Sequence, residues 1–220
     1  MIFAASVGRR RGEMPTSTEK FSQALNENAR DFRVDLQADD LKRLGQYYEL
    51  LLKWNSKLHL VAPCSPREFA TRHILESLCL LAHLPQNAQV VDIGSGAGLP
   101  IVPCLIVRDD LRAILIESSQ KKAVFLREAL RCAHRREPAR VIVARFEETV
   151  VPQADFVTCR ALDKFGKLLP ILIERAPDES ELLLFVGANL RKQLEELIPS
   201  ATVYPLPTSH RRFLIRARKI

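Results

Sequence analysis

The spacing of hydrophobic positions along this chain changes near residue 89. Before that point apolar residues recur three and four positions apart, as they do on one face of a helix. The pattern predicts a helix from about Glu19, a longer helix from Ala38 to Lys57, and a third that begins at Ser65-Pro66-Arg67-Glu68. That last stretch combines a capping box with proline at the first helical position, and both features mark helix starts.

After residue 89, short apolar runs alternate with helical segments. The predicted strands are 89–93, 113–116, 141–144, 156–159 and 181–186, and the predicted helices end near 107 or span 119–133, 163–175 and 189–197. Two extended segments, 202–206 and 212–216, follow without a helix between them. Alternating strands and helices predict a mostly parallel sheet with helices on both faces, and the final pair predicts an antiparallel hairpin at its edge.

These patterns divide the chain into three parts. Residues 1–18 carry no apolar periodicity and are predicted to be a disordered tail. Residues 19–86 form a helical extension, and residues 87–220 form a seven-stranded α/β domain. The length and the hydrophobic content of 47% are sufficient for a full globular core.

The first predicted strand runs into a loop with glycine at every second position. Asp92 ends the strand, and Gly94, Gly96 and Gly98 precede a helix. Glycine lets backbone N–H groups approach a ligand closely, because no Cβ intervenes. The spacing differs from the G-x-G-x-x-G loop that holds a pyrophosphate, so it favours an adenosine-like ligand. A turn that only needs positive φ is the alternative, although such a turn seldom uses three glycines in five residues.

Two further strand ends carry groups that suit such a ligand. Glu117 follows the second strand, 19 residues after Gly98, where an acid accepts hydrogen bonds from ribose hydroxyls. Phe146 follows the third strand, where its ring could lie flat on an adenine. The alternatives are a solvated carboxylate and a core phenylalanine. Ligands of parallel sheets lie beyond the carboxyl ends of the strands, where these groups gather. A ligand that is adenosine-like and needs no pyrophosphate loop is better matched by S-adenosylmethionine than by a nicotinamide dinucleotide.

The net charge and the cysteines indicate the class of binding partner, the absence of a metal site and the cellular compartment. The formal net charge is +7, and 23 arginines against 10 lysines favour phosphate recognition, which predicts a nucleic-acid partner over a generic basic surface. The five scattered cysteines lack a C-x-x-C pair, so we expect no zinc site, no other metal and no disulfide framework. Reduced cysteines and the absence of a long apolar run predict a cytoplasmic protein without a membrane span.

Residues 36–220 also contain short motifs in a specific order. They are Leu52-Lys53-Trp54-Asn55, Arg72-His73-Ile74-Leu75-Glu76-Ser77, Asp92-Ile93-Gly94-Ser95-Gly96-Ala97-Gly98-Leu99-Pro100, Lys121-Lys122 with Phe125-Leu126-Arg127, Arg145-Phe146-Glu147-Glu148, Arg160-Ala161 and Arg212-Phe213-Leu214. In this combination the chain resembles the bacterial 16S ribosomal RNA guanine-N7 methyltransferase family, also called glucose-inhibited division protein B.

The resemblance implies a class I S-adenosylmethionine-dependent methyltransferase fold with a helical extension. It implies a cofactor site lined by Gly94, Leu99, Phe146, Glu147 and Arg160. It also implies that Arg145 and Arg212, together with Arg160, face the RNA or the reacting guanine. The expected partner is 16S ribosomal RNA in the small ribosomal subunit, and the expected state is a monomer. Guanine N7 carries a lone pair and no proton, so methylation there needs positioning and no general base.

The chain departs from the family pattern at three points. His59 stands where asparagine is usual, Ile101 where glycine is usual, and Val186-Gly187 replaces a common Lys-Gly. Three other functions stay open on the sequence alone: a methyltransferase that acts on a small molecule or a protein, a cofactor-binding ribosome-assembly factor without turnover, and a nicotinamide dehydrogenase. The glycine spacing argues against the last.

Overall fold

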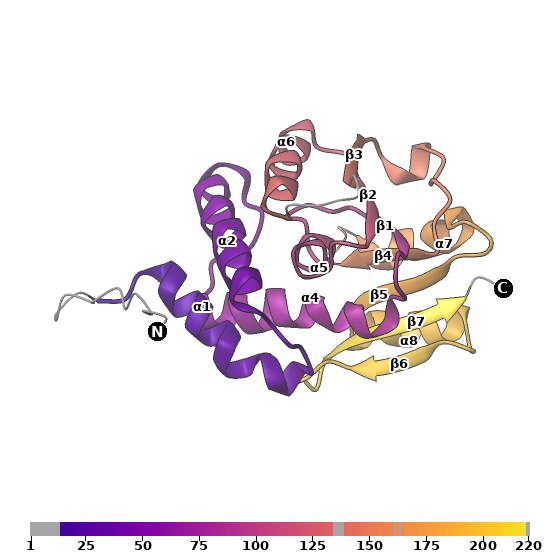
Figure 1. The fold of residues 1–220 in the computed structure, drawn as a ribbon. Helices are drawn as coiled ribbons and strands as arrows, with labels where there is room; N and C mark the ends of the chain where they lie inside the picture. Colours follow the sequence, from indigo (N-terminus) through magenta and orange to yellow (C-terminus); the bar gives the residue numbers. More distant parts are fainter. Residues whose placement is uncertain (1–13, 134–138, 161, 163, 219–220) are drawn as a thin grey trace.

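The computed structural model describes residues 14–133, 139–160, 162 and 164–218 (Figure 1). The N-terminal extension consists of α1 (Ser17–Asn28), the 3₁₀ turn η1 (Ala29–Phe32), α2 (Ala38–Leu58), α3 (Pro66–Glu68), the π-helical turn η2 (Phe69–Leu75), α4 (Glu76–Leu78) and the 3₁₀ turn η3 (Cys79–His83). The segments from α3 to η3 follow one another directly and form one helical stretch.

The sheet domain follows the extension. Its elements are β1 (Gln89–Ile93), α5 (Ile101–Val107), β2 (Arg112–Glu117), α6 (Gln120–Ala129), η4 (Leu130–Ala133), β3 (Ala139–Val143), η5 (Phe146–Glu148), β4 (Phe156–Arg160), α7 (Phe165–Arg175), β5 (Glu181–Gly187), α8 (Ala188–Leu197), β6 (Thr202–Pro205) and β7 (Arg212–Arg218). None of the helices in the described part of the chain is long and apolar enough to span a membrane.

The strands form one seven-stranded sheet in the order β3-β2-β1-β4-β5-β7-β6. The pairs among β1 to β5 are parallel, whereas β7 runs antiparallel to both β5 and β6. This confirms the predicted mostly parallel sheet with a C-terminal antiparallel hairpin. The strand order reverses between β1 and β4, which is where sheets of this type form a crevice for ligands.

Two apolar layers cover the two faces of the sheet. One layer joins α5 and α6 to the helical extension, where the rings of Phe21 and Tyr48 stack at 4.4 Å and Phe69 lies 5.0 Å from Tyr48. The other layer lies under α7 and α8, with Leu169 and Leu194 fully buried. The extension therefore shares a continuous core with one face of the sheet.

Local capping explains where two helices begin. Thr16 forms a reciprocal capping box with Glu19, so α1 starts at Ser17, two residues earlier than predicted and inside the segment assigned to the tail. The rest of that predicted tail, residues 1–13, lies outside the described residues. Ser65 caps α3 by accepting a hydrogen bond from the Glu68 N–H, which is one half of the predicted capping box; the return bond from the Glu68 side chain is not among the bonds of the described residues. The Glu68 carboxylate pairs with an arginine one turn later.

Two further element ends refine the prediction. The α2 helix ends at Leu58 because His59 adopts the left-handed conformation, with φ of 46°. The third strand covers Ala139–Val143 instead of 141–144, because its pairing with β2 begins at Ala113 opposite Ala139. Both differences arise from backbone conformation or pairing, which hydrophobic spacing does not report.

Candidate active site

Three adjoining cavities lie along the carboxyl ends of β1 to β4. The central cavity, of about 420 Å³, is lined by Leu60, Val61, Ala62, His73, Gly94, Ser95, Gly96, Ala97, Leu99, Glu117, Ser118, Lys122, Arg160 and Leu162. The second cavity, of about 530 Å³, shares Gly94, Ser118 and Leu162 with the central one and continues to Arg145, Phe146 and Glu147. We call it the β3 cavity. Together they place the predicted glycine loop at a junction of cavities.

The glycine loop uses positive φ at three residues, for two different reasons. A Cβ at Gly94 would lie 2.5 Å from Leu162 Cδ1, and one at Gly98 would lie 2.6 Å from Val102 Cγ2. Packing inside the protein therefore requires glycine at Gly98, whereas the contact at Gly94 is with the end of a flexible leucine side chain and its φ of 67° favours glycine there. A Cβ at Gly96 would meet no atom closer than 3.7 Å, although its φ of 50° disfavours a side chain. Gly96 thus exposes backbone to the central cavity, as the ligand hypothesis predicts.

Glu117 lies in the central cavity, as the sequence predicts. Its Oε2 accepts a hydrogen bond from the Gly96 N–H at 2.9 Å, and its Oε1 accepts one from the Ser119 N–H at 2.8 Å. Because each carboxylate oxygen has two lone pairs, both oxygens can accept a further hydrogen bond from a ligand. The carboxylate is thus held in place and also joins the glycine loop to the end of β2.

Asp92, predicted to bind the cofactor, lies behind the glycine loop and not in the wall of the central cavity. Its side chain is fully buried, and both carboxylate oxygens lack a hydrogen-bond partner among the described residues. Burial raises the pKa of Asp92 well above its usual value; the neighbouring Ser95 opposes this shift, and the Glu117 charge adds to it. Gly98 is also absent from the cavity wall. Both residues support the loop from behind.

Phe146 and Glu147 lie in the β3 cavity. The Phe146 side chain is buried and forms part of the core under α7, yet it also lines the cavity. Its two interpretations from sequence, core residue and ligand platform, are therefore compatible. Arg145 lines the same cavity with an exposed side chain, 4.0 Å from Glu148.

The third cavity, of about 420 Å³, lies on the other side of the central one, and we call it the arginine cavity. It is lined by Arg72, His73, Glu76, Arg160, Leu162, Phe165, Phe185, Val186, Gly187, Leu190, Leu206 and Arg212. It shares His73, Arg160 and Leu162 with the central cavity. Groups bound in these two cavities would therefore meet at three common side chains.

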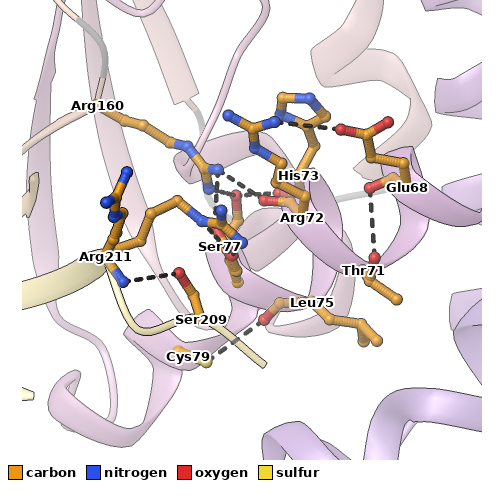
Figure 2. A network of polar contacts seen from close by, with 12 residues as sticks. Glu68, Thr71, Arg72, His73, Leu75, Ser77, Cys79, Arg160, Ser209 and Arg211 are labelled. Atoms are coloured by element: carbon orange, nitrogen blue, oxygen red, sulfur yellow. Dashed lines mark hydrogen bonds and ion pairs between the residues drawn. The ribbon is translucent and has the colours of Figure 1, made fainter. Parts of the chain in front are cut away.

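Arg160 and Arg212 come together in the arginine cavity, whereas Arg145 does not join them. Arg160 Nη2 donates to the Arg72 carbonyl at 2.6 Å, and its Nη1 donates to Ser77 Oγ at 3.3 Å (Figure 2). Both Arg160 and Arg212 also pair with the Glu76 carboxylate, at 3.1 and 2.6 Å. The three arginines predicted to face the target thus divide into a pair and a separate residue beside β3.

His73 lies at the boundary between the central and arginine cavities. Burial, and then the charges of Arg160, Arg72 and Arg212, lower the pKa of His73 to about 4. The imidazole is therefore neutral at physiological pH and keeps a lone pair for accepting a hydrogen bond.

Sequence reasoning missed several residues that the helical extension contributes. Leu60, Val61 and Ala62 form a wall of the central cavity. Asn55 holds that wall, since its side chain donates to the Val61 carbonyl at 3.1 Å and accepts from the Val61 N–H at 2.9 Å. Asn55 lies in a motif that carried the family resemblance, which was the available signal. Helical periodicity does not show that this segment reaches the cavity.

Tyr47 connects the extension to the glycine loop. Its fully buried hydroxyl donates a 2.6 Å hydrogen bond to the Ala97 carbonyl. Burial raises the pKa of Tyr47, so the hydroxyl remains a donor. Among the residues that the structure describes, no group of three or more histidine, cysteine or acidic side chains is placed to hold a metal ion.

The sequence of this chain is similar to those of known proteins of one family. The model of the family described as rRNA small subunit methyltransferase G matches residues 40–214. A protein of that name from Xanthomonas campestris pv. campestris (strain B100) is 37% identical over 163 residues, which cover 74% of this chain and 76% of the relative. A protein of the same name from Nitrosomonas eutropha is 35% identical over 166 residues, which cover 73% of this chain and 76% of the relative.

Solved structures support the fold. M. jannaschii TYW2 in complex with AdoMet aligns with a TM-score of 0.52 and 17% identity over 67% of this chain and 76% of that one. Precorrin-6y C5,15-methyltransferase from Geobacter metallireducens aligns with a TM-score of 0.51 and 17% identity over 66% of this chain and 88% of that one. At this identity the likeness concerns the fold alone. The extent of the family match and the identity to its members show that this chain belongs to the rRNA small subunit methyltransferase G family.

Proposed function

We propose that the protein transfers a methyl group from S-adenosylmethionine to N7 of a guanine in 16S ribosomal RNA of the small ribosomal subunit. The family membership and the names of the relatives support methylation of this RNA. The observation that carries the proposal is the junction of the central and arginine cavities at His73, Arg160 and Leu162. A methyl donor in one cavity and a base in the other would adjoin there.

The central and β3 cavities fit S-adenosylmethionine. When bound, this cofactor supplies an electrophilic methyl group on a sulfonium. Glu117 would accept hydrogen bonds from its ribose, because each of its oxygens has a lone pair beyond those used by the backbone. The open space at Gly96 would receive the ligand against backbone, and Phe146 would supply an aromatic surface for adenine. Leu99, Glu147 and Arg160 complete the proposed site.

The side chains of this site serve an acceptor that needs no general base. Guanine N7 already presents a lone pair, so the protein has to align the base and exclude water. We propose that Arg160 and Arg212 contact guanine O6 or the neighbouring phosphates and leave N7 free. His73 is neutral and adds no positive charge beside a sulfonium. The apolar side chains of the arginine cavity would exclude water from the base.

Arg145 has a different place in this proposal. Its exposed side chain lies beside β3, away from the arginine pair, which suits a contact with RNA outside the target base. The departure at Val186 puts an apolar side chain in the arginine cavity where the family commonly has lysine. We further propose that the protein acts as a monomer in the cytoplasm and uses no metal, since methylation at N7 requires none.

Borohydride–aniline cleavage of 16S RNA tests the proposal, because the reaction cuts at N7-methylated guanine. Wild-type protein with S-adenosylmethionine should create one cleavable site in small subunits or naked RNA. Arg145→Ala and Arg212→Ala should retain cofactor binding and lose transfer. Arg218→Ala is the matched control, because this exposed arginine lies at the far end of the strand that begins with Arg212. RNA binding should also weaken steeply with salt.

The outcomes separate the remaining alternatives. Methyl incorporation without a cleavable site would mean another atom or base. Incorporation into a protein or small molecule, without RNA, would contradict the substrate class. Cofactor binding with no transfer to either form of RNA would favour an assembly factor that has no turnover.

A further inference from the structure

A buried glutamate stands between the two arginines of the arginine cavity. We infer that Glu76 is a positioning residue that sets the orientation of Arg160 and Arg212 toward the target nucleotide. The inference rests on the proposed function, because it concerns how the two arginines meet their RNA substrate. Glu76 is fully buried and begins α4, directly after the π-helical turn η2. Single π-helical turns are frequent at functional sites.

The Glu76 carboxylate divides its two oxygens between the two arginines. Oε2 accepts from Arg160 Nη2 at 3.1 Å. Oε1 accepts from Arg212 Nε at 2.8 Å and lies 2.6 Å from its Nη2. Arg160 ends β4 and Arg212 begins β7, and β5 lies between these strands. One carboxylate therefore links two guanidinium groups that the sheet alone does not bring into contact.

These contacts use some of the donors of each guanidinium and leave others for a ligand. In the described residues, Arg160 uses Nη1 for Ser77 and Nη2 for the Arg72 carbonyl and Glu76. Arg212 uses Nε and Nη2 for Glu76, so its Nη1 group is not engaged by these bonds. Arg160 also lies over the Phe185 ring, 5.2 Å from its centroid. Both guanidinium groups are thus fixed by bonds to the protein while they line the cavity.

Charge balance supports the same role. Burial lowers the pKa of Arg160, and the Glu76 charge opposes that shift. Two guanidinium groups and one carboxylate leave a single net positive charge, which attracts RNA without leaving two close cations unpaired. A glutamine at this position would have one acceptor oxygen, and its amide N–H groups would face a guanidinium that also donates. At least one arginine would then lose its partner and its fixed orientation.

The chain contains a matched control for Glu76. Glu181 is also a buried glutamate shared by two arginines, since it accepts from Arg216 Nε and from Arg218 Nε. Both of these arginines lie on β7, as Arg212 does. In the register of β5 with β7, Glu181 faces Arg218, whereas Gly187 faces Arg212 at the opposite end. Glu181 thus repeats the chemistry away from the cavities.

The experiment compares Glu76→Gln with Glu181→Gln in the full chain. It measures thermal unfolding, S-adenosylmethionine affinity by calorimetry, and single-turnover methyl transfer to small ribosomal subunits. We expect Glu76→Gln to slow transfer by about 10- to 100-fold, the usual effect of misplacing a positioning group, with cofactor affinity changed less than about threefold. Glu181→Gln should lose stability and keep the wild-type rate. Equal rates in the two variants would overturn the inference.

Two further variants keep the inference testable. If Glu76 acts through Arg212, the Glu76→Gln change should slow transfer much less in an Arg212→Lys background, whose residual rate can be measured, than in wild type, whereas full additivity contradicts it. If Glu76→Gln does not fold, Arg212→Lys decides, because lysine keeps the charge but cannot make the Nε and Nη2 contacts together. A wild-type rate in Arg212→Lys overturns the inference. Wild-type protein that transfers no methyl group overturns the proposed function itself and this inference with it.

Discussion

Removal of the Tyr47 hydroxyl should loosen the glycine loop from the helical extension. In Tyr47→Phe the ring remains, but the Ala97 carbonyl loses the buried 2.6 Å hydrogen bond that it accepts. A neutral buried bond contributes about 1 kcal/mol, and the abandoned carbonyl adds a desolvation cost, so we expect a loss of about 1–2 kcal/mol in unfolding free energy. For a chain of this size that corresponds to a fall in Tm of about 2–8 °C.

The same change should reach the cofactor, because Ala97 lines the central cavity. If the loop has to reorder when the cofactor binds, up to the whole of this loss in free energy is also lost from the binding free energy. The Kd for S-adenosylmethionine would then rise by about 5- to 30-fold. Isothermal calorimetry and thermal unfolding measure the two effects separately. Tyr48→Phe is the control, since its ring stacks on Phe21 of α1 and not on the loop.

The combination of results decides whether the bond matters for binding. A lower Tm with an unchanged Kd would show that the hydrogen bond only supports the fold. A wild-type Tm and Kd in Tyr47→Phe would refute the energetic reasoning altogether. Equal losses of affinity in Tyr47→Phe and Tyr48→Phe would show that the effect is not specific to the loop.

Three other predictions concern the backbone and the buried acid. His59→Asn should raise the unfolding free energy by a fraction of the about 1–2 kcal/mol that left-handed backbone costs, because the short asparagine side chain can hydrogen-bond locally there; an unchanged or lower Tm would contradict this. Gly45→Ala should raise Tm through helix propensity, because the new Cβ has room at 3.5 Å or more from its neighbours. Gly98→Ala should lower Tm, because its Cβ meets Val102. A change in Tm of the same sign in both variants would refute the packing argument. Asp92 has a raised pKa in the folded state, so between the unfolded and folded pKa values the folded protein binds more protons than the unfolded chain. Across that pH range the contribution of Asp92 to the unfolding free energy falls by about 1.4 kcal/mol per pH unit. Asp92→Asn should therefore remove this loss and stabilise the ligand-free protein near pH 7, with the difference shrinking towards pH 4; a difference that does not change with pH would refute it.

The amino-acid sequence by itself determined the elements and one part of the site. Helices, strands and the closing hairpin follow from local periodicity and capping, because these depend on residues close together in the chain. The glycine loop and Glu117 were also accessible, since a strand, a loop and the next strand end lie within about thirty residues and meet at one sheet edge. Gly94, Gly96 and Glu117 line the central cavity, whereas Gly98 does not.

Only the tertiary structure decided which distant groups meet. Glu76 contacts Arg160 and Arg212 across 84 and 136 residues of sequence, and no local spacing encodes that distance. Burial placed Asp92 behind the loop, and packing of the extension brought Leu60–Ala62 to the cavity. The reason is physical: strand order and the docking of helices are set by how apolar faces fill space together, so the side chains that share a cavity are chosen by packing and not by their neighbours in the chain.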